Sequence, residues 1–274
     1  MLILAADTSS RYCSAAVYRD GEIVSDLSVN NGKTHSQVFM PMVEQALSLC
    51  GAELSQVDAF ACTVGPGSFT GVRIAVAAVK ALSQAMGKPC VAVNTLRAAA
   101  YNILDTGALV CPILDARCGQ VYAAVYDGGR EVYPVSALAL EELCDDLHAA
   151  GRSVVFTGDG VSAHRERILA RLGEAARFAP PHLGYQRAAA AAVIGAQELA
   201  AGAENLERLA DELAAQYDVV MATEIGGGIV PLEAEQRRAR EAAGRLACLL
   251  AARADTVIEM FCGIATVLKG EMPC

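Results

Sequence analysis

A glycine-rich turn joins a buried strand to a long helix early in this chain. The strand is the apolar run VDAFACTV (57–64), the turn reads GPGSFTG (65–71), and an alanine-rich helix follows. Strand, turn and helix in this order form the repeating unit of layered α/β domains. The turn either binds a phosphate group or serves mainly to position the helix that follows it.

Comparable elements surround this unit and predict a first α/β lobe over residues 1–105. They are a strand at 2–7, a hairpin turning at Asp20-Gly21, a helix between Thr34 and Gly51, a strand at 89–94 and a short helix at 95–104. The helix after the glycine turn is expected to be capped by Thr70.

The next hundred residues predict a second lobe over 106–203. The expected elements are three strands within 108–135 with a hairpin turn at 127–129, a helix at 139–149, a strand at 153–160, a helix at 161–172, the linker RFAPPHLGYQ and a closing helix at 187–202.

From residue 204 the pattern changes and predicts a further α/β fragment over 204–274. Its expected elements are a helix at 204–216, a strand at 217–224, a glycine loop at 225–231, a long helix at 232–254 and a strand pair at 255–270. The glycine loop follows a strand and precedes a helix, but it has no lysine and is a weak nucleotide signal.

Composition limits the functional classes. The formal net charge is −9 and the only dense basic cluster is formed by Arg237, Arg238 and Arg240, so we expect a partner to hold any RNA substrate. No apolar run reaches the ~20 residues of a membrane span, and no basic residue precedes the short apolar N-terminus. The ten cysteines are scattered without a Cys-x-x-Cys pair, which favours small buried thiols in the cytoplasm over disulfides or zinc.

Three short motifs invite a phosphate-binding interpretation. Asp7-Thr8-Ser9 at the end of the first strand resembles the first phosphate loop of actin-like ATPases, although an ordinary strand end has the same composition. The GPGSFTG turn points free N–H groups of a helix at its loop, but no P-loop lysine follows. Gly32-Lys33-Thr34 lacks the first glycine of a P-loop and is predicted to be a turn and helix cap.

No nucleophilic constellation is evident. The four histidines have no nearby serine or cysteine in a recognisable catalytic frame, and we expect them to be solvated; they are His35, His148, His164 and His182.

The first ~200 residues resemble the TsaB family, whose members are required to make N6-threonylcarbamoyladenosine next to the tRNA anticodon. The blocks that carry the resemblance are LILAADTSS, THSQVFMPMVEQAL, VGPGSFTGVRIAVAAVKALS, DARCGQVYAAVY and VVFTGDG, in the order typical of that family. The resemblance implies a two-lobed actin-like ATPase (ASKHA) fold.

A paralogue of this family, the catalytic subunit TsaD, carries a metal-binding His-x-x-x-His on the helix after the strand at 89–94. Here Thr95 and Ala99, or residues near them, occupy the ligand positions, and neither side chain holds a metal as histidine does. The second lobe also shows no obvious glycine-rich phosphate loop. The resemblance therefore implies a non-catalytic subunit with no metal site and no required cofactor, with ATP or ADP contact at Asp7, Thr8 and Ser9 as a secondary hypothesis.

The resemblance further implies that the helices after THS and after GPGSFTG form an association surface. The implied partners are a TsaD-like catalytic subunit or a second copy of the chain, together with a TsaE-like ATPase, and tRNA is reached only through the complex. A broad apolar stripe and an alanine-rich face favour this interface over helices that only cover their own sheet. The predicted interface residues are Phe39, Met42, Val43, Ala46, Ile74, Ala78 and Ala81.

Residues ~205–270 resemble instead the C-terminal part of CobU, the adenosylcobinamide kinase/guanylyltransferase. The P-loop and the guanylylated histidine of that family have no counterpart in this chain. Two alternative functions stay open on the sequence: a protein related to this cobalamin-pathway enzyme, and an ASKHA-type ATPase.

Overall fold

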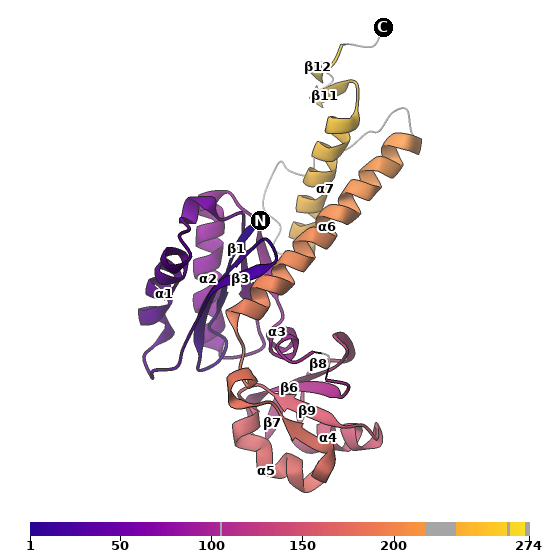
Figure 1. Ribbon diagram of the computed structural model, residues 1–274. Coiled ribbons are helices and arrows are strands. Elements are labelled where there is room, and N and C mark those ends of the chain that lie inside the picture. The colour runs from indigo at the N-terminus through magenta and orange to yellow at the C-terminus, as the bar shows by residue number, and fades with distance from the viewer. Residues whose placement is uncertain (105, 217–233, 262–263, 272–274) are drawn as a thin grey trace. The chain divides into compact units, whose positions relative to one another are not determined.

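The computed structural model describes residues 1–104, 106–216, 234–261 and 264–271 (Figure 1). The chain forms two compact units, Met1–Gln197 and Glu198–Cys274. The predicted strand at 217–224 and glycine loop at 225–231 lie outside the described residues.

A five-stranded sheet forms the centre of the first lobe. Its strands are β1 (Leu2–Asp7), β2 (Cys13–Arg19), β3 (Glu22–Val29), β4 (Ala59–Thr63) and β5 (Cys90–Val93), in the order β3-β2-β1-β4-β5. The first three strands are antiparallel, as the predicted hairpin requires, whereas β4 and β5 run parallel to β1. Asp20 and Gly21 make the hairpin turn, both with positive φ.

Helices α1 (His35–Leu49) and α2 (Phe69–Met86) lie side by side on one face of this sheet (Figure 1). A single core joins both helices to the sheet through Phe39 of α1, Val79 of α2 and Phe60 of β4. The start of α6 (Ala188–Gln216) packs near the opposite face, where a Cβ on Gly195 would lie 3.0 Å from the Cβ of Ala61.

The helix α6 differs from the sequence prediction. Residues 187–202 and 204–216 were expected to form two helices, yet residues 188–216 form one continuous helix. The only glycine near the expected break is Gly202, and the segment contains no proline. One glycine costs a helix about 1 kcal/mol, and the surrounding alanine, glutamate and leucine residues offset that cost.

The second lobe contains another five-stranded sheet. Its strands are β6 (Leu109–Arg117), β7 (Gln120–Asp127), β8 (Arg130–Ala139), β9 (Val154–Thr157) and β10 (Ala176–Phe178), in the order β10-β9-β6-β7-β8. Helices α4 (Leu140–Ala149) and α5 (Val161–Leu172) cover one face, and α3 (Thr95–Tyr101) packs through Leu96 and Ala100 on the other. The strand β10 was expected to be part of a linker.

The two lobes have the same topology, which the sequence did not reveal. In each lobe, three antiparallel strands are followed by a helix, a parallel strand, a second helix and a fifth parallel strand. Numbered within its lobe, each sheet has the order 3-2-1-4-5. This duplicated mixed sheet confirms the predicted two-lobed actin-like fold class.

In the second unit, α7 (Ala234–Arg253) precedes the antiparallel pair β11 (Val257–Phe261) and β12 (Ile264–Lys269), which confirms the predicted strand pair. The guanidinium of Arg253 contacts the carboxylates of Glu207 and Asp211 on α6. Within the described residues, no helix is long and apolar enough to span a membrane.

The cysteines are less uniformly buried than expected. All eight in the described part of the chain are free thiols; four are buried, Cys50 is half-buried, and Cys90, Cys118 and Cys248 are exposed.

Candidate functional site

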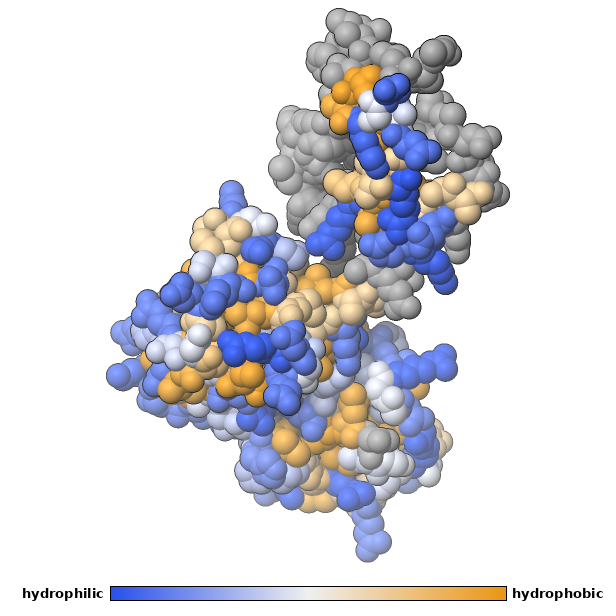
Figure 2. Space-filling view, turned by 45° about the horizontal axis from the view of Figure 1, so that its top comes forward, coloured by the Kyte–Doolittle hydropathy of each residue, from blue (hydrophilic) through white to orange (hydrophobic). Residues whose placement is uncertain are grey.

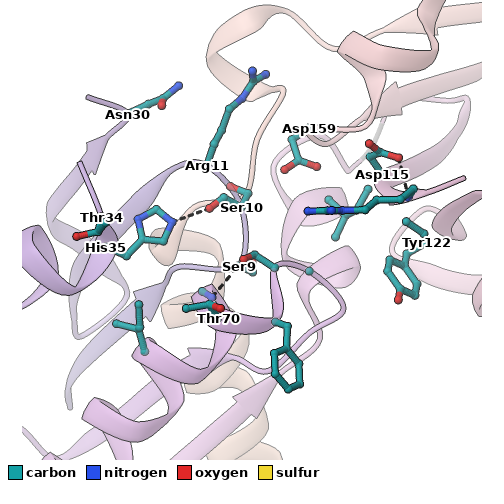
Figure 3. A pocket seen from close by; sticks show the side chains of 18 of the residues that line it. Ser9, Ser10, Arg11, Asn30, Thr34, His35, Thr70, Asp115, Tyr122 and Asp159 are labelled. Atoms are coloured by element: carbon teal, nitrogen blue, oxygen red, sulfur yellow. Dashed lines mark hydrogen bonds between the residues drawn. The ribbon is translucent and has the colours of Figure 1, made fainter. Parts of the chain in front are cut away.

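A cavity of about 1030 Å³ opens between the two lobes of the first unit (Figure 3). Turns at the ends of strands line it from both lobes. Most of the lining residues lie within the β1–β2 turn (Ser9–Arg11), the β3–α1 loop and the start of α1 (Asn30–Ser36), the β4–α2 turn and the start of α2 (Gly67–Gly71), the last residues of β6 (Leu114–Arg117), and the β9–α5 turn and the start of α5 (Asp159–Ala163). This cleft is the principal candidate site of the chain.

The residues of the predicted phosphate motif are buried, and most of their polar groups form hydrogen bonds within the protein. Asp7, Thr8 and Ser9 are all at most 2% exposed. The Thr8 hydroxyl donates to the Gly71 carbonyl at 2.6 Å and accepts from the Ala75 N–H at 3.2 Å, so it ties β1 to α2. Both the backbone N–H and the hydroxyl of Ser9 donate to Asp7 Oδ1 at 2.9 Å.

The carboxylate of Asp7 is buried at the end of β1. Its Oδ2 has no hydrogen-bond partner among the described residues. Burial raises the pKa of Asp7, and the contacts with Thr63 and Ser9 oppose that rise. Of the three predicted residues, only Ser9 lines the cleft.

The glycine turn is shaped by its contact with β1. A Cβ on Gly67 would lie 2.5 Å from the Ser9 carbonyl oxygen, and one on Gly71 would lie 2.1 Å from the Thr8 carbonyl oxygen. The Ser68 N–H donates to the Ser9 carbonyl at 2.7 Å. The glycines are therefore needed for close backbone packing, which supports the interpretation that the turn positions α2.

The cap of α2 was predicted wrongly. Ser68, not Thr70, is the N-cap, and its hydroxyl accepts from the Gly71 N–H at 3.2 Å. The helix begins two residues earlier than expected because Ser68 is held against Ser9.

The second lobe supplies cleft residues that the sequence analysis missed. Asp115 lies near the end of β6, much as Asp7 ends β1, and its Oδ1 accepts from the Arg117 N–H at 2.9 Å. Asp159 lies on the β9–α5 turn, where burial raises its pKa and the positive charge of Arg11 opposes the rise. The glycines on either side of Asp159 were the available signal, because glycine pairs mark close backbone approach.

His164 is buried, contrary to the expectation that it is solvated. The residue is 6% exposed; its Nδ1 lies 3.3 Å from Arg167, and its Nε2 lies 3.6 Å from Asp115 Oδ1. It therefore supports the cleft wall from behind. His35 lines the cleft, and its Nε2 lies 2.7 Å from the Ser10 carbonyl oxygen.

The predicted interface residues divide into two groups. Phe39, Met42, Val43 and Ala46 are at most 6% exposed and belong to the core of the first lobe, because that side of α1 packs on its own sheet. Ile74 and Ala78 are half-buried, and Ala81 is exposed. The exposed apolar residues of the helix pair also include Leu49, 65% exposed, and Phe69, 70% exposed, and Phe69 also lies at the cleft. In space-filling view, hydrophobic residues reach the surface in patches among hydrophilic ones (Figure 2).

The two positions compared with metal ligands have structural roles. The Thr95 hydroxyl accepts from the Gly65 N–H at 3.1 Å, and the Thr95 N–H donates to the Gly65 carbonyl at 2.9 Å. Ala99 is fully buried. Thr95 therefore supports the glycine turn, and neither residue offers the imidazole nitrogen with which a histidine ligates metal.

Comparison with known proteins decides the family. A family model described as TsaD, tRNA N6-adenosine threonylcarbamoyltransferase, matches residues 29–222. The TsaB protein of Bacillus subtilis (strain 168), a tRNA threonylcarbamoyladenosine biosynthesis protein, is 33% identical over 177 residues, covering 63% of this chain and 77% of that protein. The chain belongs to the TsaB family. The TsaB protein of Escherichia coli (strain K12) is 38% identical over 128 residues, which cover 46% of this chain and about half (55%) of that relative.

Solved structures agree with this TsaB membership. YeaZ from Pseudomonas aeruginosa is 32% identical with a TM-score of 0.60, over 73% of this chain and 93% of that one. Residues 182–268 match a second family model, described as cobinamide kinase / cobinamide phosphate guanyltransferase (CobU). The CobU-like similarity of the C-terminal part is thus confirmed, and it begins before the predicted boundary at 204.

Proposed function

We propose that this chain is a non-catalytic subunit in the synthesis of threonylcarbamoyladenosine on tRNA, acting as the partner of a TsaD-type threonylcarbamoyltransferase. Membership of the TsaB family is the observation that carries the proposal. In it, a TsaE-like ATPase joins the same complex, tRNA is contacted through that complex, and the assembly works in the cytoplasm.

Two features of the site support a non-catalytic role. Thr95 and Ala99 are structural residues at positions where the catalytic paralogue is expected to ligate metal. The hydroxyls of Thr8 and Ser9 are already engaged in internal hydrogen bonds. Contact of Asp7, Thr8 and Ser9 with ATP or ADP stays a prediction.

The outer surface of α1 and α2 is the proposed docking surface for the partner. Since Phe39 and Met42 already pack within the lobe, the partner is proposed to contact the outward residues, including Ala81 and Phe69. Small side chains such as Ala77 and Ala81, both exposed, let a second helix approach closely. A substitution at Met42 would disturb the core and would not isolate the interface.

The test is association of the full chain with the TsaD of its own organism, followed by analytical ultracentrifugation. We expect a 1:1 complex that Ala81→Arg weakens at least tenfold, because an arginine side chain at this position of α2 would keep the partner's helix away. The matched control is Ala170→Arg on α5, an exposed alanine of the corresponding helix in the second lobe, and it should leave binding unchanged. Lack of association by the unaltered chain would overturn the proposed function.

The CobU-like segment suggests no second activity. It covers less than a third of the chain, and the P-loop typical of that family has no counterpart in the sequence. Its contribution is open to a direct measurement, namely binding of GTP or cobinamide to the full chain.

A further inference from the structure

The charge of the helix α2 differs sharply from that of the whole chain. Residues 59–104 contain four of the 22 basic residues and none of the 31 acidic ones, whereas the chain's average would place about five acidic residues in a segment of this length. Three of these basic residues, Arg73, Lys80 and Lys88, belong to α2 or follow its C-cap. An acidic protein thus carries an 18-residue helix without a single carboxylate.

The cations of α2 also lack partners. Within the described residues, Arg73, Lys80 and Lys88 form no ion pair, and Arg73 instead lies over the Phe69 ring at 3.7 Å from its centroid. In the second lobe, arginines are neutralised by carboxylates, as in the pairs Arg152–Asp127 and Arg171–Asp145. Arg73 and Lys80 are exposed, so α2 presents uncompensated positive charge to solvent.

The neighbouring helix does not cancel this charge. Glu44 is the single acidic residue of α1, which contains no lysine or arginine. The docking surface formed by α1 and α2 is therefore net positive on a chain of formal charge −9. A second copy docked through the same surface would bring two sets of unpaired cations together, and like charges in contact oppose association.

We propose that α2 selects an acidic partner, namely a protein whose docking helices carry aspartate or glutamate opposite Arg73 and Lys80, and that the same charges disfavour pairing with a second copy. This inference rests on the proposed function, since it concerns the same docking surface. The charges set specificity and encounter rate, and the apolar residues around Phe69 contribute buried area.

The experiment titrates the full chain, and its Lys80→Glu and Lys80→Gln variants, with the TsaD of the same organism at 50 and 300 mM NaCl, using calorimetry. We expect wild-type binding to weaken about tenfold with salt, Lys80→Glu to lose about tenfold at low salt, and Lys80→Gln to fall between. The matched control is Arg130→Glu, the same charge reversal at an exposed residue of β8, and it should bind like the wild type.

A second measurement follows self-association of the chain. A mixture of wild type and Lys80→Glu should form mixed dimers more readily than wild type forms its own, as measured by sedimentation. Salt-independent binding of TsaD that Lys80→Glu does not weaken would overturn the charge selection and leave the partner role standing. Self-association of the wild type tighter than its binding to TsaD would also overturn it, and no binding to TsaD at any salt concentration would overturn the proposed function itself.

Discussion

The two lobes of the first unit share a strand order, but the aspartate near the end of the first strand differs in solvent exposure between them. In the first lobe, Asp7 is 1% exposed, and in the second lobe the side chain of Asp115 is 48% exposed. Both carboxylates accept a hydrogen bond from the backbone N–H two residues later. The same local turn is thus buried in one lobe and open to solvent in the other, and tertiary packing makes the difference.

The turn before the second helix has the same role in both lobes: it holds the helix close to the first strand. Ser68 N–H donates to the Ser9 carbonyl in one lobe, and Gly160 N–H donates to the Ile113 carbonyl in the other. Glycines lie at both contacts. A Cβ added at Gly71 would lie 2.1 Å from the Thr8 carbonyl oxygen, and one added at Gly158 would lie 2.3 Å from the Ile113 carbonyl oxygen. Close approach of helix and first strand is therefore what the glycine turns provide in both lobes.

The largest expected effect tests this shared role. Gly71→Ala and Gly158→Ala should each lower the free energy of unfolding by about 3 kcal/mol, because a methyl group would meet a backbone carbonyl. Gly51→Ala and Gly151→Ala are the controls; both glycines have positive φ but open space around them, so each should cost about 1 kcal/mol. Denaturant titration measures the difference, and losses equal to those of the controls would contradict the packing role.

A smaller effect separates the two aspartates. Because burial raises the pKa of Asp7, the folded protein holds that proton to higher pH than the unfolded chain does. Stability contributed by this group is then lost as pH rises from the ordinary carboxyl range through the folded pKa. Asp7→Asn should stabilise the protein by about 1–2 kcal/mol at pH 7 and remove that loss.

The matched change Asp115→Asn should alter stability by less than about 0.5 kcal/mol, since its carboxylate is half exposed. Urea unfolding of both variants between pH 4 and pH 8 makes the comparison. Equal effects of the two substitutions would show that burial does not distinguish the two turns.

The smallest effect concerns the helix caps. Ser68→Ala removes the side chain that accepts from Gly71 N–H and should cost about 1 kcal/mol. The N-cap of α5 is Gly160, and Gly160→Ser should not gain that amount, because its Cβ would lie 2.9 Å from the Ile113 carbonyl oxygen. Thermal unfolding of the two variants would decide; a stabilised Gly160→Ser would show that the turn has room for a cap.

Much of this architecture was readable from local patterns. The Asp20-Gly21 hairpin, the helix at 161–172 and the strand pair near the C-terminus follow from turn residues and periodicity, which act over a few neighbouring residues. Family motifs gave the two-lobed fold. The predicted boundary at residue 204 does not interrupt α6, because one glycine is too weak a signal to end a helix.

The sequence by itself determined most of the α/β elements, the glycine turn and the family, since these depend on short-range chemistry. Only the tertiary structure decided which side chains reach the surface. It placed Phe39 and Met42 in the core, buried His164 behind Asp115, and brought Ser9 and Asp159 to one cleft. An apolar stripe on a helix fits an internal sheet as well as a partner, and packing between distant segments settles which of the two it covers.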